Sequence, residues 1–125
     1  YEINYDDLER EQRRAILSRI RYNPTADNSA KLKYGFYGDL LTKDTVSLEH
    51  LQPASKNGKT TLSNLVLASK SKNQLRGCAD IRLFADKATV WNYLLQFVGV
   101  KTKHFNGNSY IKGIIKTLQT LGINL

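Results

Sequence analysis

An acid, an imidazole and two amides occur within one stretch of the chain, in an order that suits chemistry on a phosphodiester. Glu49 and His50 are adjacent at the end of a short alternating run, Asn64 opens a second apolar run, and Asn73 follows in a polar segment. Carboxylate and amide oxygens are hard ligands that suit Mg²⁺ or Mn²⁺. A neutral imidazole, with an ordinary pKa of about 6.5, can take a proton from water. These residue types indicate metal-assisted hydrolysis.

Two short strands and a helix are predicted to carry these groups. Residues 45–48 alternate between polar and apolar side chains as a half-buried strand does, and residues 65–68 have high β-propensity. Residues 53–63 contain a proline, an asparagine and a glycine, which favours a surface loop. Ser69 is a natural N-cap for a helix that closes at Gly77. An antiparallel hairpin with this helix folded across it would bring the acid, the imidazole and an amide together.

Strand geometry limits how the acid and the imidazole can cooperate. Adjacent residues of a regular strand point to opposite faces, so Glu49 and His50 share a pocket only if the strand ends or bends there. Alternatively, the metal and the attacking water lie on different sides of the phosphate, as in-line attack requires. The sequence leaves both arrangements open.

Basic residues dominate the same stretch. No acidic side chain occurs between residues 56 and 77. The cationic side chains there are Lys56, Lys59, Lys70, Lys72 and Arg76. A solvated charged face is the default interpretation, but beside a metal site such a run would form a phosphate-binding rim. The whole chain has 19 basic and 11 acidic residues, a net charge of +8, which favours nucleic acid as a partner more than an anionic membrane.

The remaining segments are predicted to be helices and their connections. The 125 residues are enough for one domain, residues 1–125, with a single core. Apolar side chains recur at helical spacing in residues 6–21, 85–98 and 110–121, and Ser109 is the predicted cap of the last helix. Together with the hairpin, these helices predict an α+β fold.

Cysteine content and hydropathy exclude some classes of protein. A single cysteine, Cys78, excludes an internal disulfide and any zinc site built from cysteines. No apolar run approaches the roughly 20 residues of a membrane span, and no signal-peptide pattern opens the chain. We therefore expect no membrane partner and a cytoplasmic location.

The central stretch resembles the motif of the HNH endonucleases, a family of nucleases with a ββα-metal fold. The resemblance covers residues 46–77 and agrees in order, spacing and residue type. The matching residues are Glu49, His50, Pro53, Ser55, Asn57, Gly58, residues 64–68, Asn73, Arg76 and Gly77. The resemblance implies an α+β fold with a ββα-metal (HNH) centre, in which a small antiparallel hairpin is flanked by helices.

The resemblance also implies a role for each matched residue. His50 would be the general base, and Glu49 and Asn73 would be ligands of one divalent cation, Mg²⁺ or Mn²⁺. Asn64 would bridge the loop by hydrogen bonds and hold the base in place. Arg76 would lie near the phosphates of the nucleic acid backbone.

The chain departs from the family pattern where many members bind a structural zinc ion through two pairs of cysteines. Tyr34 and Tyr37 stand at the first pair of positions, and Ser69 and Lys72 stand at the second. We therefore expect no structural zinc. Together with Phe36, the two tyrosines would fill the volume instead.

The sequence therefore predicts an endonuclease that hydrolyses nucleic acid, with DNA favoured over RNA as the substrate. One alternative is a catalytically silent module that binds nucleic acid through its basic rim. Another is a toxin nuclease with an immunity partner, which would use the same chemistry in a different context.

Overall fold

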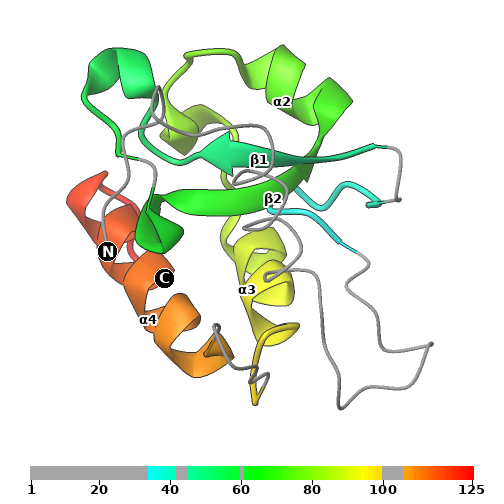
Figure 1. The fold of residues 1–125 in the computed structure, drawn as a ribbon, viewed down its shortest axis with the longest axis vertical. Helices are drawn as coiled ribbons and strands as arrows, with labels where there is room; N and C mark the ends of the chain where they lie inside the picture. Colours follow the sequence, from blue (N-terminus) through cyan, green and yellow to red (C-terminus); the bar gives the residue numbers. More distant parts are fainter. Residues whose placement is uncertain (1–33, 42–44, 60, 100–105) are drawn as a thin grey trace.

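Two antiparallel strands and the helices around them make up the computed structural model (Figure 1). The structure describes residues 34–41, 45–59, 61–99 and 106–125. Its elements are β1 (Val46–His50), the 3₁₀ helices Ala54–Lys56 and Leu62–Asn64, β2 (Leu65–Ser69), α2 (Lys70–Arg76), the 3₁₀ helix Ile81–Leu83, α3 (Lys87–Leu95) and α4 (Gly107–Thr120). The α+β prediction is confirmed at this level. The helix predicted at residues 6–21 lies outside the described residues.

β1 and β2 form an antiparallel hairpin, as the sequence predicts. Val46 pairs with Ser69 and His50 pairs with Leu65, so regular pairing continues through His50. Since the strand neither ends nor bends between Glu49 and His50, their side chains lie on opposite faces of the hairpin. The arrangement in which a bend turns both side chains into one pocket is therefore wrong.

α2 begins and ends where the sequence predicts. The Ser69 hydroxyl accepts a hydrogen bond from the Lys72 N–H at 3.3 Å and caps the first turn. Gly77 has a φ of 55°, which favours glycine, and its N–H donates to the Asn73 carbonyl. The helix therefore starts directly at the end of β2 and turns back along β1 (Figure 1).

The two later helices differ from their predicted ranges at the ends. α3 begins after its cap Asp86 and ends at Leu95, and a turn then leads to Gly99, where φ is 75°. α4 begins at residue 107 instead of 110, because Asn106 and not Ser109 is the cap. The Asn106 side-chain oxygen accepts from the Ser109 N–H at 3.0 Å. No helix among the described residues is long and apolar enough to cross a membrane.

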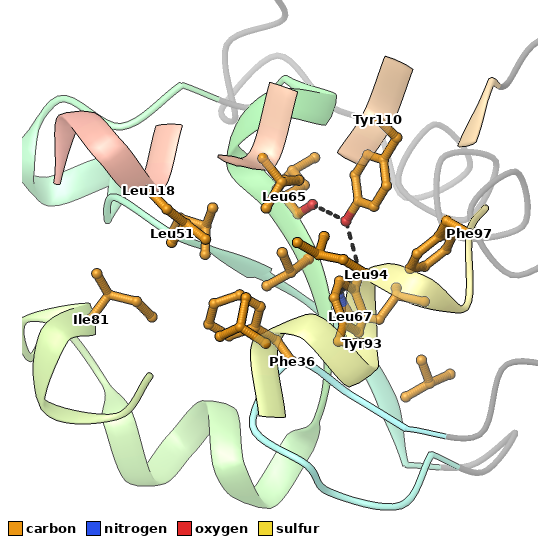
Figure 2. Close-up of a cluster of buried hydrophobic side chains, with 14 residues drawn as sticks. Phe36, Leu51, Leu65, Leu67, Ile81, Tyr93, Leu94, Phe97, Tyr110 and Leu118 are labelled. Atoms are coloured by element: carbon orange, nitrogen blue, oxygen red, sulfur yellow. Dashed lines mark hydrogen bonds between the residues drawn. The ribbon is translucent and has the colours of Figure 1, made fainter. Parts of the chain in front are cut away.

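The core lies where the hairpin meets α3 and α4 (Figure 2). Four aromatic rings form a chain of edge-to-face contacts, in which neighbouring ring centroids are 4.9 to 5.9 Å apart. The order of the rings in this chain is Phe36, Tyr93, Phe97 and Tyr110. Each such pair adds about 0.5–1.5 kcal/mol beyond the burial of its area. The buried aliphatic side chains are Val46, Leu51, Leu65, Val66, Leu67, Ile81, Val90, Leu94, Ile114 and Leu118. The rings therefore join α3 and α4 into one hydrophobic cluster with β2.

Other segments complete the hydrogen bonding of the outer edge of β2, which faces no strand among the described residues. The Leu67 N–H donates to the Tyr93 hydroxyl at 3.0 Å, and the Leu67 carbonyl accepts from the Phe36 N–H at 2.8 Å. The Tyr110 hydroxyl donates to the Leu65 carbonyl at 2.7 Å and lies 2.8 Å from the Tyr93 hydroxyl (Figure 2). Because Tyr110 uses its proton on Leu65, Tyr93 is the donor between the two hydroxyls.

We expect Tyr110→Phe to lower the free energy of unfolding by about 1–3 kcal/mol, because it leaves the buried Leu65 carbonyl without a donor and the proton of the Tyr93 hydroxyl without an acceptor. Urea denaturation followed by circular dichroism measures the change. Tyr34→Phe removes a hydroxyl from a side chain that is 48% exposed, and serves as the control with an effect within about 0.5 kcal/mol. An equal, small effect of both substitutions would show that the tyrosine pair does not stabilise β2.

Candidate active site

Asn73 of α2 is docked on the exposed edge of β1 by its amide nitrogen. Its Nδ2 donates to the Leu48 carbonyl at 3.0 Å and to the Ser47 hydroxyl at 3.1 Å. A carbonyl only accepts hydrogen bonds, so the NH₂ group and not the amide oxygen must face the strand. No described residue donates to the Asn73 Oδ1. That oxygen therefore keeps its lone pairs and fits the role of a ligand to a hard cation.

Arg76, one helical turn further on, joins α2 to the end of β1. Its Nη1 donates to the His50 carbonyl, and its Nη2 donates to the Leu51 carbonyl at 2.7 Å. The same Nη1 lies 3.3 Å from the Glu49 carboxylate and 3.5 Å from the Tyr37 hydroxyl. The residue is only 3% exposed. The structure therefore corrects the interpretation of Arg76 as part of the phosphate-binding rim, because its guanidinium is occupied inside the protein.

Glu49 is a buried acid whose two oxygens already have partners. Oε1 faces Arg76, and Oε2 accepts from the Tyr37 hydroxyl at 3.1 Å. Burial raises the pKa of Glu49 to about 7, although Arg76 and Tyr37 both oppose the shift. Burial, reinforced by the nearby Glu49 carboxylate, also raises the pKa of Tyr37. A divalent cation would have to displace Arg76 from Glu49, so in this arrangement Glu49 does not fit the role of an open ligand.

His50 has its backbone anchored on both sides. Its carbonyl accepts from Arg76, and its N–H donates to the Glu49 carboxylate. Its half-buried side chain lies on the other face of the hairpin from Glu49. The backbone from which the imidazole extends is therefore held by β1, by Arg76 and by Glu49.

Asn64 ties together the two ends of the loop that follows His50. Its Oδ1 accepts from the Gln52 N–H at 2.9 Å, and its Nδ2 donates to the carbonyls of Gln52 at 3.1 Å and Lys59 at 2.7 Å. Its backbone carbonyl also accepts from the Leu51 N–H. The side chain is 6% exposed. Asn64 is thus a brace of the loop, and its side-chain oxygen and nitrogen are both occupied by the loop backbone.

The predicted lysine rim is divided into two groups, which lie at opposite ends of β1. Lys56 and Lys59 are exposed on the loop after β1, and Lys70 and Lys72 are exposed at the start of α2. The Lys70 N–H donates to the Thr45 carbonyl, at the beginning of β1. At about 3.3 Å per strand residue, the two ends of β1 are roughly 15 Å apart. The four lysines therefore do not form one cluster.

The three aromatic residues expected to fill the volume of the structural zinc, Tyr34, Phe36 and Tyr37, differ in their burial. Phe36 is fully buried in the core, and the Tyr37 ring meets those of Phe36 and Phe84 edge to face. Tyr34 is half exposed and does not fill the volume as expected. Sequence reasoning also missed that Tyr37 contacts Glu49, since no periodic pattern marks a contact between segments so far apart in the chain.

Comparison with protein-family models, with curated proteins and with solved structures gives no match to this chain. In the candidate site, α2 places Asn73 against β1, the strand that carries Glu49 and His50. Asn64 holds the loop that follows this strand.

Arg76→Met should lower the free energy of unfolding by about 3–5 kcal/mol at pH 8, because it leaves Glu49 buried without its partner charge. The double variant Glu49→Leu/Arg76→Met should recover a large part of that loss, since no charge then remains buried. Urea denaturation of the two single variants and the double variant gives the coupling energy. Lys72→Met, on the exposed face of α2, is the control. Losses that simply add would contradict a coupled buried pair.

The raised pKa of Glu49 predicts how stability depends on pH. The folded protein holds this proton up to about pH 7, whereas a carboxyl with the ordinary pKa of 4.5 releases it earlier in the unfolded chain. The contribution of this proton to stability is therefore complete below pH 4.5 and is lost as the pH rises to about 7. Denaturation at a series of pH values should show this decline in the wild type relative to Glu49→Gln. Parallel curves for the two proteins would rule out the assignment.

Proposed function

We propose that this chain is an HNH-type endonuclease, which hydrolyses phosphodiester bonds of nucleic acid with a divalent cation and with His50 as the general base. The observation that carries the proposal is the docking of Asn73 on β1. Its amide nitrogen is bound to the strand, and its amide oxygen has no donor among the described residues. The HNH motif needs a ligand oxygen beside the strand that ends in Glu49 and His50, and the Asn73 Oδ1 can supply it.

His50 is the residue to which we assign proton transfer. A neutral imidazole accepts a proton from the attacking water, and general-base catalysis of this kind contributes about 10²–10⁴-fold. The regular pairing of His50 with Leu65 and the hydrogen bond from Arg76 to its carbonyl fix the backbone from which the imidazole extends. Asn64 supports the same end of β1, because it binds the backbone of Gln52 two residues further on.

The proposed cation would be Mg²⁺ or Mn²⁺, with the Asn73 Oδ1 as its protein ligand. When bound, such an ion supplies stabilisation of negative charge on the phosphate. Glu49 would join the ligand set only after it releases Arg76. When ionised, Glu49 instead balances the charge of Arg76, which in turn holds the His50 carbonyl.

The exposed lysines support nucleic acid as the substrate. Lys70 and Lys72 lie at one end of β1 and Lys56 and Lys59 at the other, so basic side chains flank the strand that carries His50. Cationic side chains on both sides of a site can contact successive phosphates of one backbone. DNA is the substrate that we propose.

His50→Ala should slow the nicking of supercoiled plasmid by about 10²–10⁴-fold in the presence of Mg²⁺ or Mn²⁺, because it removes the general base. It should leave the affinity for DNA unchanged, since the lysines remain. EDTA should abolish nicking by the wild-type protein. Agarose gels measure the rate, and fluorescence anisotropy measures the affinity. Lys112→Ala, at an exposed position of α4, is the control.

Two outcomes would contradict the proposal in different ways. Equal activity of wild type and His50→Ala would remove the proposed mechanism while leaving a nuclease. Binding of DNA by the wild type without nicking, in Mg²⁺ and in Mn²⁺, would instead favour a catalytically silent binding module.

A further inference from the structure

A hollow of about 400 Å³ opens beside the end of β1. Its walls come from the loop after β1, the segment after α2 and the end of α4. It is lined by Leu51, Gln52, Pro53, Lys56, Arg76, Asp80, Ile81, Arg82, Thr120, Leu121 and Gly122. The volume lies within the roughly 300–1,000 Å³ that is usual for small-molecule sites. None of the roles assigned above requires this hollow, so what it binds is a separate question.

The hollow adjoins the end of β1 that carries His50, on the side of the backbone. Arg76 lines it, and the same guanidinium donates to the carbonyls of His50 and Leu51. Leu51, the next residue after the proposed base, also lines it. A group bound in the hollow would therefore lie next to the backbone of His50.

The loop wall of the hollow is held in one conformation. The Gln52 Nε2 donates to the Lys56 carbonyl at 2.7 Å, and the Lys56 N–H donates to the Pro53 carbonyl at 2.9 Å. At Gly58 a Cβ atom would lie 1.7 Å from the Gln52 carbonyl oxygen, so only glycine allows this close approach. Lys56 is thus presented from a braced loop.

The opposite wall presents a second cation, Arg82, which is ion-paired with Asp80. Arg82 forms a forked ion pair with Asp80, with nitrogen–oxygen distances of 2.8 to 3.2 Å. The Arg82 Nη1 and the Lys56 Nζ donate to no described residue. Both side chains are exposed, and each therefore retains donors for an anion.

The hollow also has an apolar lining, and the Asp80 carboxylate lies near both cations. Pro53, Ile81 and Leu121 line the hollow, and Ile81 is nearly fully buried beneath it. A ligand that matches this lining has an anionic group for the cations and an apolar or flat part for the apolar side chains. A nucleotide has both parts, whereas inorganic phosphate has only the first.

We propose that the hollow binds the nucleotide next to the scissile phosphate in the strand that is cut. Lys56 and Arg82 contact its phosphate, and its sugar and base lie against Pro53 and Ile81. This inference rests on the proposed nuclease function and adds a substrate subsite to it. The end of α4, through Thr120, forms the side of the hollow that a bulky substitution can close.

The steric test uses neighbouring positions at the end of α4. Both Thr120 and Gln119 are exposed, but only Thr120 lines the hollow. In a His50→Ala background with EDTA, Thr120→Trp should weaken the binding of a fluorescein-labelled single-stranded oligonucleotide by about tenfold, whereas Gln119→Trp should not. Fluorescence anisotropy measures both affinities, and thermal unfolding confirms that both variants fold.

The charge test uses the salt dependence of the same binding. Lys56→Gln should reduce the slope of log K against log salt concentration by about 0.7, the value for one phosphate contact with a single strand. Lys112→Gln removes the same charge from an exposed position of α4 outside the hollow, and should leave the slope unchanged. Competition by a deoxynucleoside monophosphate should be stronger than by inorganic phosphate, and should be weakened by Thr120→Trp.

Wild-type affinity and salt slope in both Thr120→Trp and Lys56→Gln would overturn the subsite, even if the wild-type protein nicks DNA. Equal competition by inorganic phosphate and by the mononucleotide would also overturn it, because the apolar surface would then contribute nothing. If the wild-type protein neither nicks DNA nor binds the oligonucleotide, the proposed function and the subsite both fail.

Discussion

A sheet of two strands has two unpaired edges, and the protein must satisfy the backbone groups of both by other means. At the buried edge of β2, Tyr93 and Tyr110 take the places that a third strand would occupy, and Phe36 supplies a backbone N–H. The Asp39 carboxylate accepts from the Ser69 N–H at the end of the same edge. Because these groups come from three segments, the hairpin is stable only when α3, α4 and the segment around Phe36 are all docked.

The edge of β1 is satisfied differently, by side chains of α2 instead of a core tyrosine pair. Asn73 and Arg76 donate to the carbonyls of Leu48 and His50, so their amide and guanidinium groups are held by the backbone of the strand. Such bonds hold a functional group more firmly than surface packing does, and a site needs this firmness. The same hydrogen bonds that complete a short sheet thus orient the proposed ligand and the proposed base. A buried arginine, however, requires a counter-charge, and the Glu49 carboxylate supplies it once the pH exceeds its raised pKa of about 7.

The local features of the hairpin and of α2 are predictable from the sequence, because each depends on near neighbours. The cap at Ser69, the end at Gly77 and the antiparallel pairing all follow from residue type and spacing. The start of α4 is not predictable in this way. Asn106 and Ser109 are both good N-cap residues, and only tertiary packing selects between them. A similar limit applies to Glu49, whose partners come from other segments.

The role of Glu49 shows what a motif leaves open. An acid before a histidine has the same residue type whether it ligates a cation or neutralises a buried arginine, and the difference lies in what faces it. Asn73 and Arg76 are three positions apart, so on a helix they lie on the same face and contact the same strand. If Asn73 reaches the middle of β1, then Arg76 must reach its end, where Glu49 lies. The spacing of these two α2 residues was thus a readable signal that the arginine would lie inside the site and not on its rim.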